Sequence, residues 1–258
     1  MNKKGITVLS ILIMNTIGTF AQKQVVNQNH NWLMYVGNHK LNDKWELHTL
    51  YHFRRSLDDN YAWQQSLLRA GVNYKMDKNI LLSVGADWVV SFPYGQQPSK
   101  YTNNELTGWQ AVIVKQNIGR LNMMHRYRIE ERFIQKKAID AVEGNYVNDG
   151  IKYANRFRYW YNLNVPINKP TMQEKTWCLN GWNEVFIDLE PGPVYNLLNQ
   201  NRIGANVGYQ WRKGFNLQAG YMNQLLVKAD AHKAEINHTI MLQLQYDLDF
   251  SKILSSIP

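Results

Sequence analysis

The chain has 258 residues, a formal net charge of +9 at pH 7 and a single cysteine, Cys178. One cysteine excludes an intrachain disulfide, and therefore a small disulfide-stabilised secreted fold. After the N-terminal segment, no apolar run approaches the roughly 20 residues that a spanning helix needs, which excludes a helical membrane protein.

The N-terminus is typical of a secretory signal peptide. Two lysines precede a mostly apolar stretch, residues 6–17, and the small residue Ala21 comes before Gln22. We predict cleavage after Ala21, which removes residues 1–21 and leaves residues 22–258 as one domain. The alternative, an N-terminal membrane anchor, needs a longer apolar run. The residue directly after the cleavage site is Gln22 and not a cysteine, so a lipoprotein anchor is excluded.

The rest of the chain alternates polar and apolar residues with period two, which predicts strands, and no segment has a clear helical period. Turn residues divide this pattern into eleven candidate strands: 32–37, 44–54, 63–76, 80–91, 106–118, 121–135, 153–165, 177–189, 202–211, 215–226 and 236–250. Prolines fall in the connections or at strand ends, where the missing N–H does no harm.

The predicted strand 121–135 decides how the others are interpreted. One of its faces carries four consecutive charges, Arg126, Arg128, Glu130 and Arg132. The other face carries Met123, Tyr127, Ile129 and Phe133. An unpaired buried charge costs too much to form an ordinary core. The charged face must therefore meet water or partner charges, and the apolar face suits lipid, as in a transmembrane β-strand.

The connections support a membrane barrel. Those near 38–43, 77–79, 119–120, 167–175 and 212–214 are mostly short, and those near 55–62, 92–105, 136–152, 190–200 and 227–235 are mostly longer and polar. Aromatic residues lie beside the short turns, as an interfacial girdle requires. We predict an all-β, antiparallel, up-and-down transmembrane barrel in the outer membrane. Because bacterial single-chain barrels usually have an even strand number, we expect twelve strands, with ten as the alternative and residues 22–31 as the source of the twelfth.

In a soluble β-sandwich or lipocalin-like barrel the two faces of every strand would be exchanged, with the apolar faces inside and the arginines in solvent. Period two alone does not distinguish the two arrangements. Strand lengths of mostly 10 to 15 residues, the aromatic placement and the unequal connections favour the membrane.

Several segments resemble a known family, domain-of-unknown-function 2490. They are residues 125–133 (HRYRIEERF), 201–204 (NRIG), 209–211 (YQW), 220–224 (GYMNQ) and the ending 237–250. The resemblance covers most of the chain after residue 21, and the Arg/Glu strand is its most specific part. It implies an outer-membrane β-barrel of a type common in Bacteroidetes, and it supplies no activity, ligand or catalytic residue.

The predicted inward-facing charges are eight arginines and six carboxylates, the latter being Glu46, Asp87, Glu130, Glu184, Asp247 and Asp249. Ten of these residues form the candidate site. They are Arg54, Arg69, Arg126, Arg128, Glu130, Arg132, Arg156, Arg158, Glu184 and Arg202. Arginine suits bidentate pairing with carboxylate or phosphate, and rings of arginine favour anions in pores. One interpretation is a passive channel or small-solute barrel with anion preference. The other is a closed lumen held by salt bridges, in a barrel that scaffolds an outer-membrane assembly through its long loops.

Other classes of function have less support. His125 and His238 face outward without a neighbouring strand serine, so a rim-located lipid hydrolase has no motif and we predict no enzyme. His48 and His52 share a strand face but lie roughly 13 Å apart, which does not suit a metal site. We expect no cofactor and no nucleic-acid partner, because the basic residues interleave with acids. The expected partners are membrane lipid, small anionic solutes and other outer-membrane proteins.

Overall fold

The computed structural model describes residues 24–190, 197–228, 230 and 232–251. The predicted signal peptide, residues 1–21, lies outside this part of the chain. No helix in the described part has the length and apolarity to cross a membrane.

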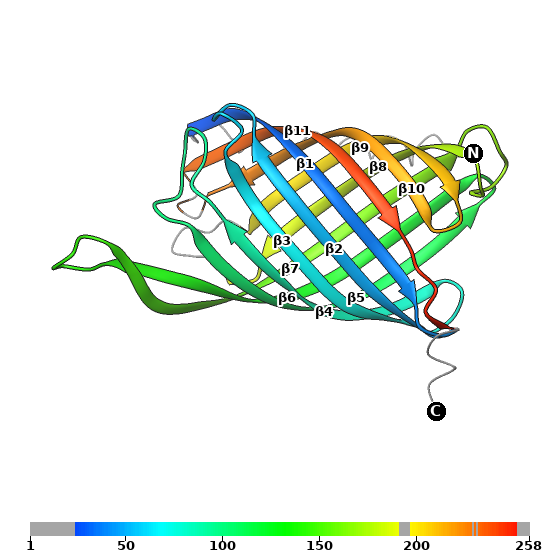
Figure 1. The fold of residues 1–258 in the computed structure, drawn as a ribbon, viewed down its shortest axis with the longest axis horizontal. Coiled ribbons are helices and arrows are strands. Elements are labelled where there is room, and N and C mark those ends of the chain that lie inside the picture. Colours follow the sequence, from blue (N-terminus) through cyan, green and yellow to red (C-terminus); the bar gives the residue numbers. More distant parts are fainter. Residues whose placement is uncertain (1–23, 191–196, 229, 231, 252–258) are drawn as a thin grey trace, which may run out of the picture.

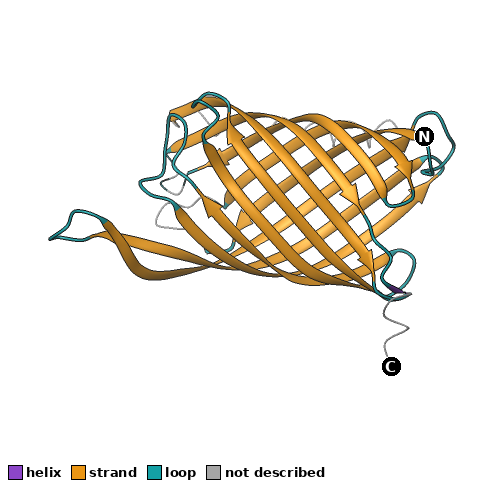
Figure 2. Ribbon diagram, viewed as in Figure 1, coloured by secondary structure: helices purple, strands orange, loops and turns teal. Residues whose placement is uncertain are grey.

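The described residues form a closed barrel of eleven tilted strands, each paired with its neighbour in the chain (Figures 1 and 2). The strands are β1 Gln24–Lys40, β2 Trp45–Ser56, β3 Trp63–Lys75, β4 Ile80–Ser91, β5 Asn103–Ile118, β6 Leu121–Ile139, β7 Tyr146–Pro166, β8 Thr176–Asp188, β9 Leu198–Arg212, β10 Phe215–Val227 and β11 Lys233–Tyr246. The prediction of an all-β barrel is confirmed.

The strand number differs from the expected twelve or ten. Residues 24–31 do not form a separate strand but extend the first predicted strand into the long β1. An odd barrel has its first and last strands running in the same direction, so the closing pair must be parallel. β1 pairs with β11 in parallel from Gln24↔Lys233 to Val36↔Gln245, and all other pairs are antiparallel.

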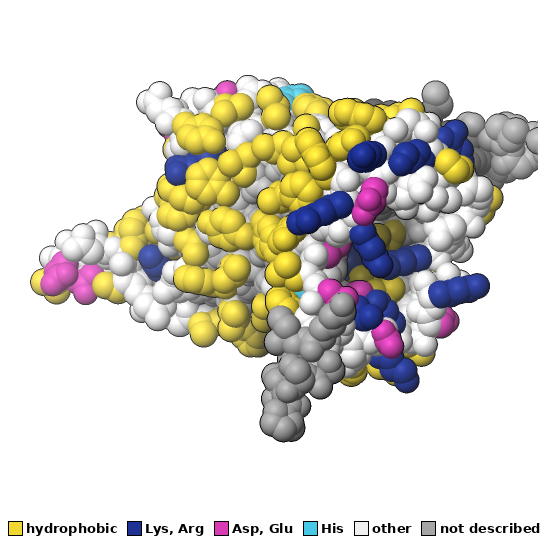
Figure 3. All heavy atoms as spheres, turned by 45° about the vertical axis from the view of Figure 1, so that its right-hand side comes forward, with side chains coloured by type: hydrophobic (Ala, Val, Ile, Leu, Met, Phe, Trp, Pro, Cys, Tyr) yellow, Lys and Arg dark blue, Asp and Glu magenta, His cyan; other side chains and the backbone are white. Residues whose placement is uncertain are grey.

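The two faces of the wall follow the predicted alternation. On β6, Tyr127 and Ile129 are 45% and 47% exposed on the outside, whereas Arg128 and Glu130 are 2% and 0% exposed on the inside. Hydrophobic side chains cover much of the outer wall in Figure 3. The alternative arrangement, with apolar side chains inside and the arginines outside, is therefore wrong. The fold places the arginines in the lumen.

The barrel has two unlike ends. At the short-turn end, residues 41–44, 76–79, 119–120, 167–175 and 213–214 connect the strands; the connections after β2, β4, β6, β8 and β10 lie at the other end, the loop end. The prediction of a loop over residues 136–152 is largely wrong. β6 and β7 continue as a paired ribbon, with Lys137 opposite Asn148 and Ile139 opposite Tyr146, that projects beyond the barrel (Figure 1). β11 also ends at Tyr246, earlier than the expected residue 250.

Candidate functional site

The lumen holds a cavity of about 810 Å³ lined by residues of all eleven strands. All ten predicted site residues face it or bond to residues that do. Together with Asp87 and Glu105 they form what we call the arginine belt: Arg54, Arg69, Asp87, Glu105, Arg126, Arg128, Glu130, Arg132, Arg156, Arg158, Glu184 and Arg202. The strands β6 and β7 pair with each other, and their arginines bond to lumen carboxylates.

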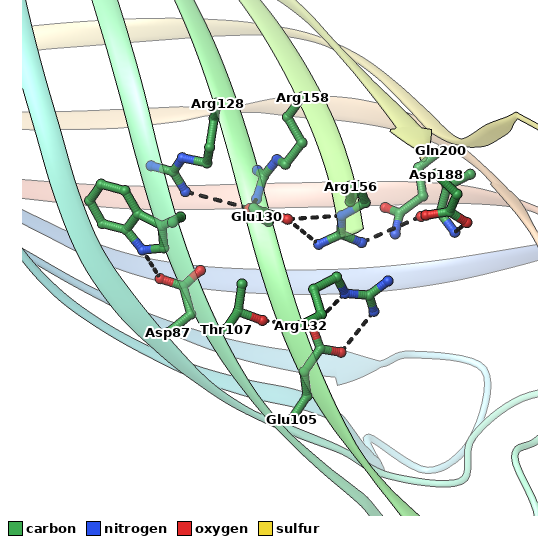
Figure 4. Close-up of polar contacts among 12 residues, drawn as sticks. Asp87, Glu105, Thr107, Arg128, Glu130, Arg132, Arg156, Arg158, Asp188 and Gln200 are labelled. Atoms are coloured by element: carbon green, nitrogen blue, oxygen red, sulfur yellow. Dashed lines mark hydrogen bonds and ion pairs between the residues drawn. The ribbon is translucent and has the colours of Figure 1, made fainter. Parts of the chain in front are cut away.

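Glu130 on β6 is one centre of the belt (Figure 4). Its Oε2 accepts from Nε and Nη2 of Arg156 at 2.8 and 2.6 Å, and its Oε1 accepts from Nη1 of Arg158 at 2.5 Å. Arg156 lies directly opposite Glu130 in the β6–β7 pair. Because two guanidinium groups share one carboxylate, Glu130 is fully occupied without exposure to solvent.

Glu184 on β8 is the second centre. Its Oε1 accepts from Nη2 of Arg126 at 2.7 Å and from Nε and Nη2 of Arg158 at 3.2 and 2.6 Å. Arg202 approaches Oε2 at 3.7 Å from the neighbouring strand β9. Arg158 thus bridges the two carboxylates, and the belt is continuous from β6 to β9.

Two further pairs complete the belt, and the carboxylate of each pair is absent from the predicted site residues. Arg69 donates to Asp87 at 2.7 and 2.5 Å, and Trp109 Nε1 donates to the same carboxylate at 2.7 Å. Arg132 donates to both oxygens of Glu105 at 2.7 and 2.8 Å. Asp87 was recognised as inward-facing, whereas Glu105 was assigned to a loop; β5 in fact begins at Asn103.

Two glycines make room for the indole of Trp109. Gly71 and Gly85 lie opposite each other in the β3–β4 pair, on the lumen face. A Cβ at Gly85 would lie 2.5 Å from Cζ2 of Trp109 and 2.4 Å from the Ala70 carbonyl oxygen. Because neither glycine has a side chain, the buried Trp109 ring can lie against the backbone at these positions and reach Asp87.

The belt carries more positive than negative charge, with eight arginines against four carboxylates. Arg54 illustrates the excess. It hydrogen-bonds to Gln65 and His52, and its guanidinium carbon lies 3.8 Å from the centroid of the Trp32 ring. Arg202 approaches the same ring at 5.2 Å. Stacking on an aromatic face stabilises a cation without neutralising it, so the lumen stays positive.

At the loop end, residues 92–102 reach across the mouth to the opposite wall and form what we call the lid. Tyr94 donates to Glu235 Oε2 at 3.0 Å and packs edge-on against His30. Gly95 has φ +68°, and a Cβ there would lie 1.6 Å from Gln28 Oε1. Burial, and next the charge of Glu235, raise the pKa of Tyr94 above its usual range. Tyr94 therefore stays a neutral donor.

At the short-turn end, the cavity reaches side chains of the rim, among them Lys115 and Asp247. Figure 3 shows Lys, Arg, Asp and Glu side chains gathered around this mouth. Charged side chains of both signs therefore surround the cavity at the short-turn end, whereas the lid crosses the loop end.

The histidines fall where the sequence placed them. His48 and His52 line the lumen, and His48 Nδ1 is 2.9 Å from Asn38 Oδ1. Of the outward pair, His125 contacts the Tyr159 hydroxyl at 2.8 Å and His238 contacts that of Tyr221 at 2.6 Å. Within the described ranges, no group of three or more His, Cys, Asp or Glu side chains is arranged to hold a metal ion.

Comparison with known proteins gives one match. The model of a family described as "Protein of unknown function (DUF2490)" matches residues 29–235. The chain belongs to this family. The DUF2490 match runs from β1 into the start of β11, and so takes in both carboxylate centres of the arginine belt. No curated protein and no solved structure matches the chain.

Proposed function

We propose that this DUF2490 protein is an outer-membrane β-barrel whose lumen admits small anionic solutes from its short-turn end. The observation that carries the proposal is the charge of the arginine belt around a cavity of about 810 Å³. In a cavity of low dielectric, fixed cations raise the local concentration of anions and exclude cations. Four carboxylates offset only half of the arginines.

The outer wall supports the membrane part of the proposal. On β4 the outward residues run from Leu82 to Val90, which matches the 9 to 11 residues of a tilted spanning strand. Aromatic pairs lie near both ends of this apolar band, Trp177 against Tyr209 at the short-turn end and Phe133 against Tyr153 at the loop end. Such girdles are typical of the two interfaces of a bilayer.

Ion selectivity in planar bilayers tests the proposal. The wild-type barrel should conduct with a reversal potential that favours the anion under a salt gradient. Arg126→Ala, Arg128→Ala and Arg156→Ala should each move that potential toward cation preference, because each removes one lumen charge. Arg55→Ala is the control, since its guanidinium stacks outside the barrel on Trp63 at 3.8 Å. Absence of conductance, or equal shifts in the control, would contradict the proposal.

A second candidate function, a scaffold in an outer-membrane assembly, is favoured by the projecting β6–β7 ribbon. Ile139, Val142 and Ile151 are exposed there. A two-stranded ribbon with exposed apolar side chains is marginal in water and gains stability from a partner. Deleting residues 137–148 should leave the barrel folded and remove any stoichiometric partner that co-purifies with it. Retention of that partner would count against the scaffold.

A further inference from the structure

Arg128 on β6 is the one belt arginine whose surroundings point to a ligand most directly. It is 2% exposed, and its guanidinium carbon lies 4.1 Å from the centroid of the Trp109 ring. Its Nε and Nη1 find no hydrogen-bond acceptor within the described part of the chain. Buried N–H groups without acceptors are costly, and more so on a charged group.

The nearby carboxylates are occupied by other donors. Glu130 Oε1 lies 3.7 Å from Arg128 Nη1, too far for a hydrogen bond, and it accepts from Arg158 instead. Asp87 accepts from Arg69 and Trp109. Neither carboxylate can turn to Arg128 without breaking a shorter bond, so Arg128 keeps only the long ion pair to Glu130 and gains no hydrogen bond from either carboxylate.

The guanidinium of Arg126, two residues away on the same face of β6, adds to the positive charge around Arg128. Arg126 donates Nη2 to Glu184, but its Nε has no acceptor among the described residues. Its guanidinium carbon lies 4.9 Å from the Trp160 ring centroid. Arg126, Arg128 and Trp160 all line the lumen cavity, which continues to Lys115 and Asp247 at the short-turn end. Both guanidinium groups therefore border a cavity whose lining extends to the rim of the short-turn end.

We infer that Arg128 and Arg126 bind a small oxyanion, a phosphate, sulfate or carboxylate group, inside the lumen. Oxygen atoms of such a group would accept from the buried, unpartnered Nε and Nη1 atoms, and the aromatic rings against both guanidinium groups hold the donors in place. The inference deepens the proposed function and rests on it, because it names the class of solute that the anion-admitting lumen takes.

Calorimetric titration of the purified barrel in detergent micelles tests the site. The probes are inorganic phosphate and, separately, acetate, each at constant ionic strength in a chloride background. We expect saturable binding of at least one probe, and a roughly tenfold to hundredfold loss of affinity in Arg128→Gln. Arg128→Lys keeps the charge but not the planar fork, so its affinity should fall between the two.

The matched control is Arg55→Gln, which removes an arginine outside the belt whose guanidinium stacks on Trp63 at 3.8 Å. Its affinity should change less than about twofold. Heat-modifiable gel mobility, measured for every variant, identifies those that fold. Folded wild-type protein that binds neither probe would overturn the inference, and so would equal losses in Arg128→Gln and the control.

The two proposals fail separately. Binding that depends on Arg128, in a barrel that shows no conductance in planar bilayers, would retain the oxyanion site and remove the open anion path. Anion-selective conductance without binding of either probe would retain the path and remove the site.

Discussion

Arg69 on β3 and Asp87 on β4 lie directly opposite each other across the sheet, and the guanidinium donates to both carboxylate oxygens at 2.7 and 2.5 Å. Both side chains are buried in the lumen. A charge pair in this position is costly to break, because removing one partner leaves the other charge buried.

Asp87→Asn should therefore lower the free energy of unfolding by about 3–5 kcal/mol. The double variant Arg69→Met with Asp87→Asn should recover much of that loss, since no unpaired charge remains. Urea unfolding in lipid vesicles, followed by tryptophan fluorescence, measures both. Additive losses in the double variant would show that the pair does not act as a unit.

Gly85→Ala should destabilise the barrel by about 1–3 kcal/mol, because the new methyl group meets the Trp109 ring and the Ala70 carbonyl. Gly108→Ala on β5 is the control, since a Cβ there meets no atom within 4 Å. Thermal unfolding of the two variants compares them. Equal losses would mean that the cost comes from the strand backbone and not from the packing of Trp109.

Tyr94→Phe should loosen the lid and increase single-channel conductance, because it removes the hydrogen bond to Glu235. Since the folded protein raises the pKa of Tyr94, the neutral phenol persists through pH 10, and its contribution is lost only as the pH rises through the raised value. The difference between wild type and variant should therefore be constant from pH 7 to about 10 and shrink above it. Identical conductance at pH 7 would show that Tyr94 does not hold the lid.

Ile129→Arg should weaken insertion into lipid vesicles by about 2–4 kcal/mol, because Ile129 lies near the middle of the outward stripe on β6. Gln243→Lys, on the lumen side, should cost far less. Folding titrations into vesicles measure both. If the outer wall faced water instead of lipid, Ile129→Arg would have almost no cost.

The strands could be predicted because the two sides of each strand meet different surroundings, which forces alternation into the sequence. Residues 80–91 show this well: the predicted and observed bounds of β4 are the same. Where both sides of a ribbon meet similar surroundings, the alternation of polar and apolar residues disappears. The extension of β6 and β7 beyond the barrel was therefore mistaken for a loop.

The inward arginines could likewise be read from the alternation, but their partners could not. Contacts between distant segments could not be predicted either. Tyr94 and Glu235, for example, are 141 positions apart, in segments without a shared local pattern. The unsatisfied donors of Arg128 are likewise invisible in sequence, because they depend on which carboxylates other arginines occupy. The rule that bacterial barrels have an even number of strands was also misleading. The sequence pattern indicates eleven candidate strands, and the described residues form eleven.

The parallel seam between β1 and β11 has a topological consequence. In a barrel with an even number of strands, the chain enters and leaves at the same rim. Here Gln24 begins β1 at the loop end and Tyr246 ends β11 at the short-turn end. Once inserted, the protein would thus present its first and last strand residues to opposite aqueous compartments, so that two reporters attached beside them would sense different sides of one membrane.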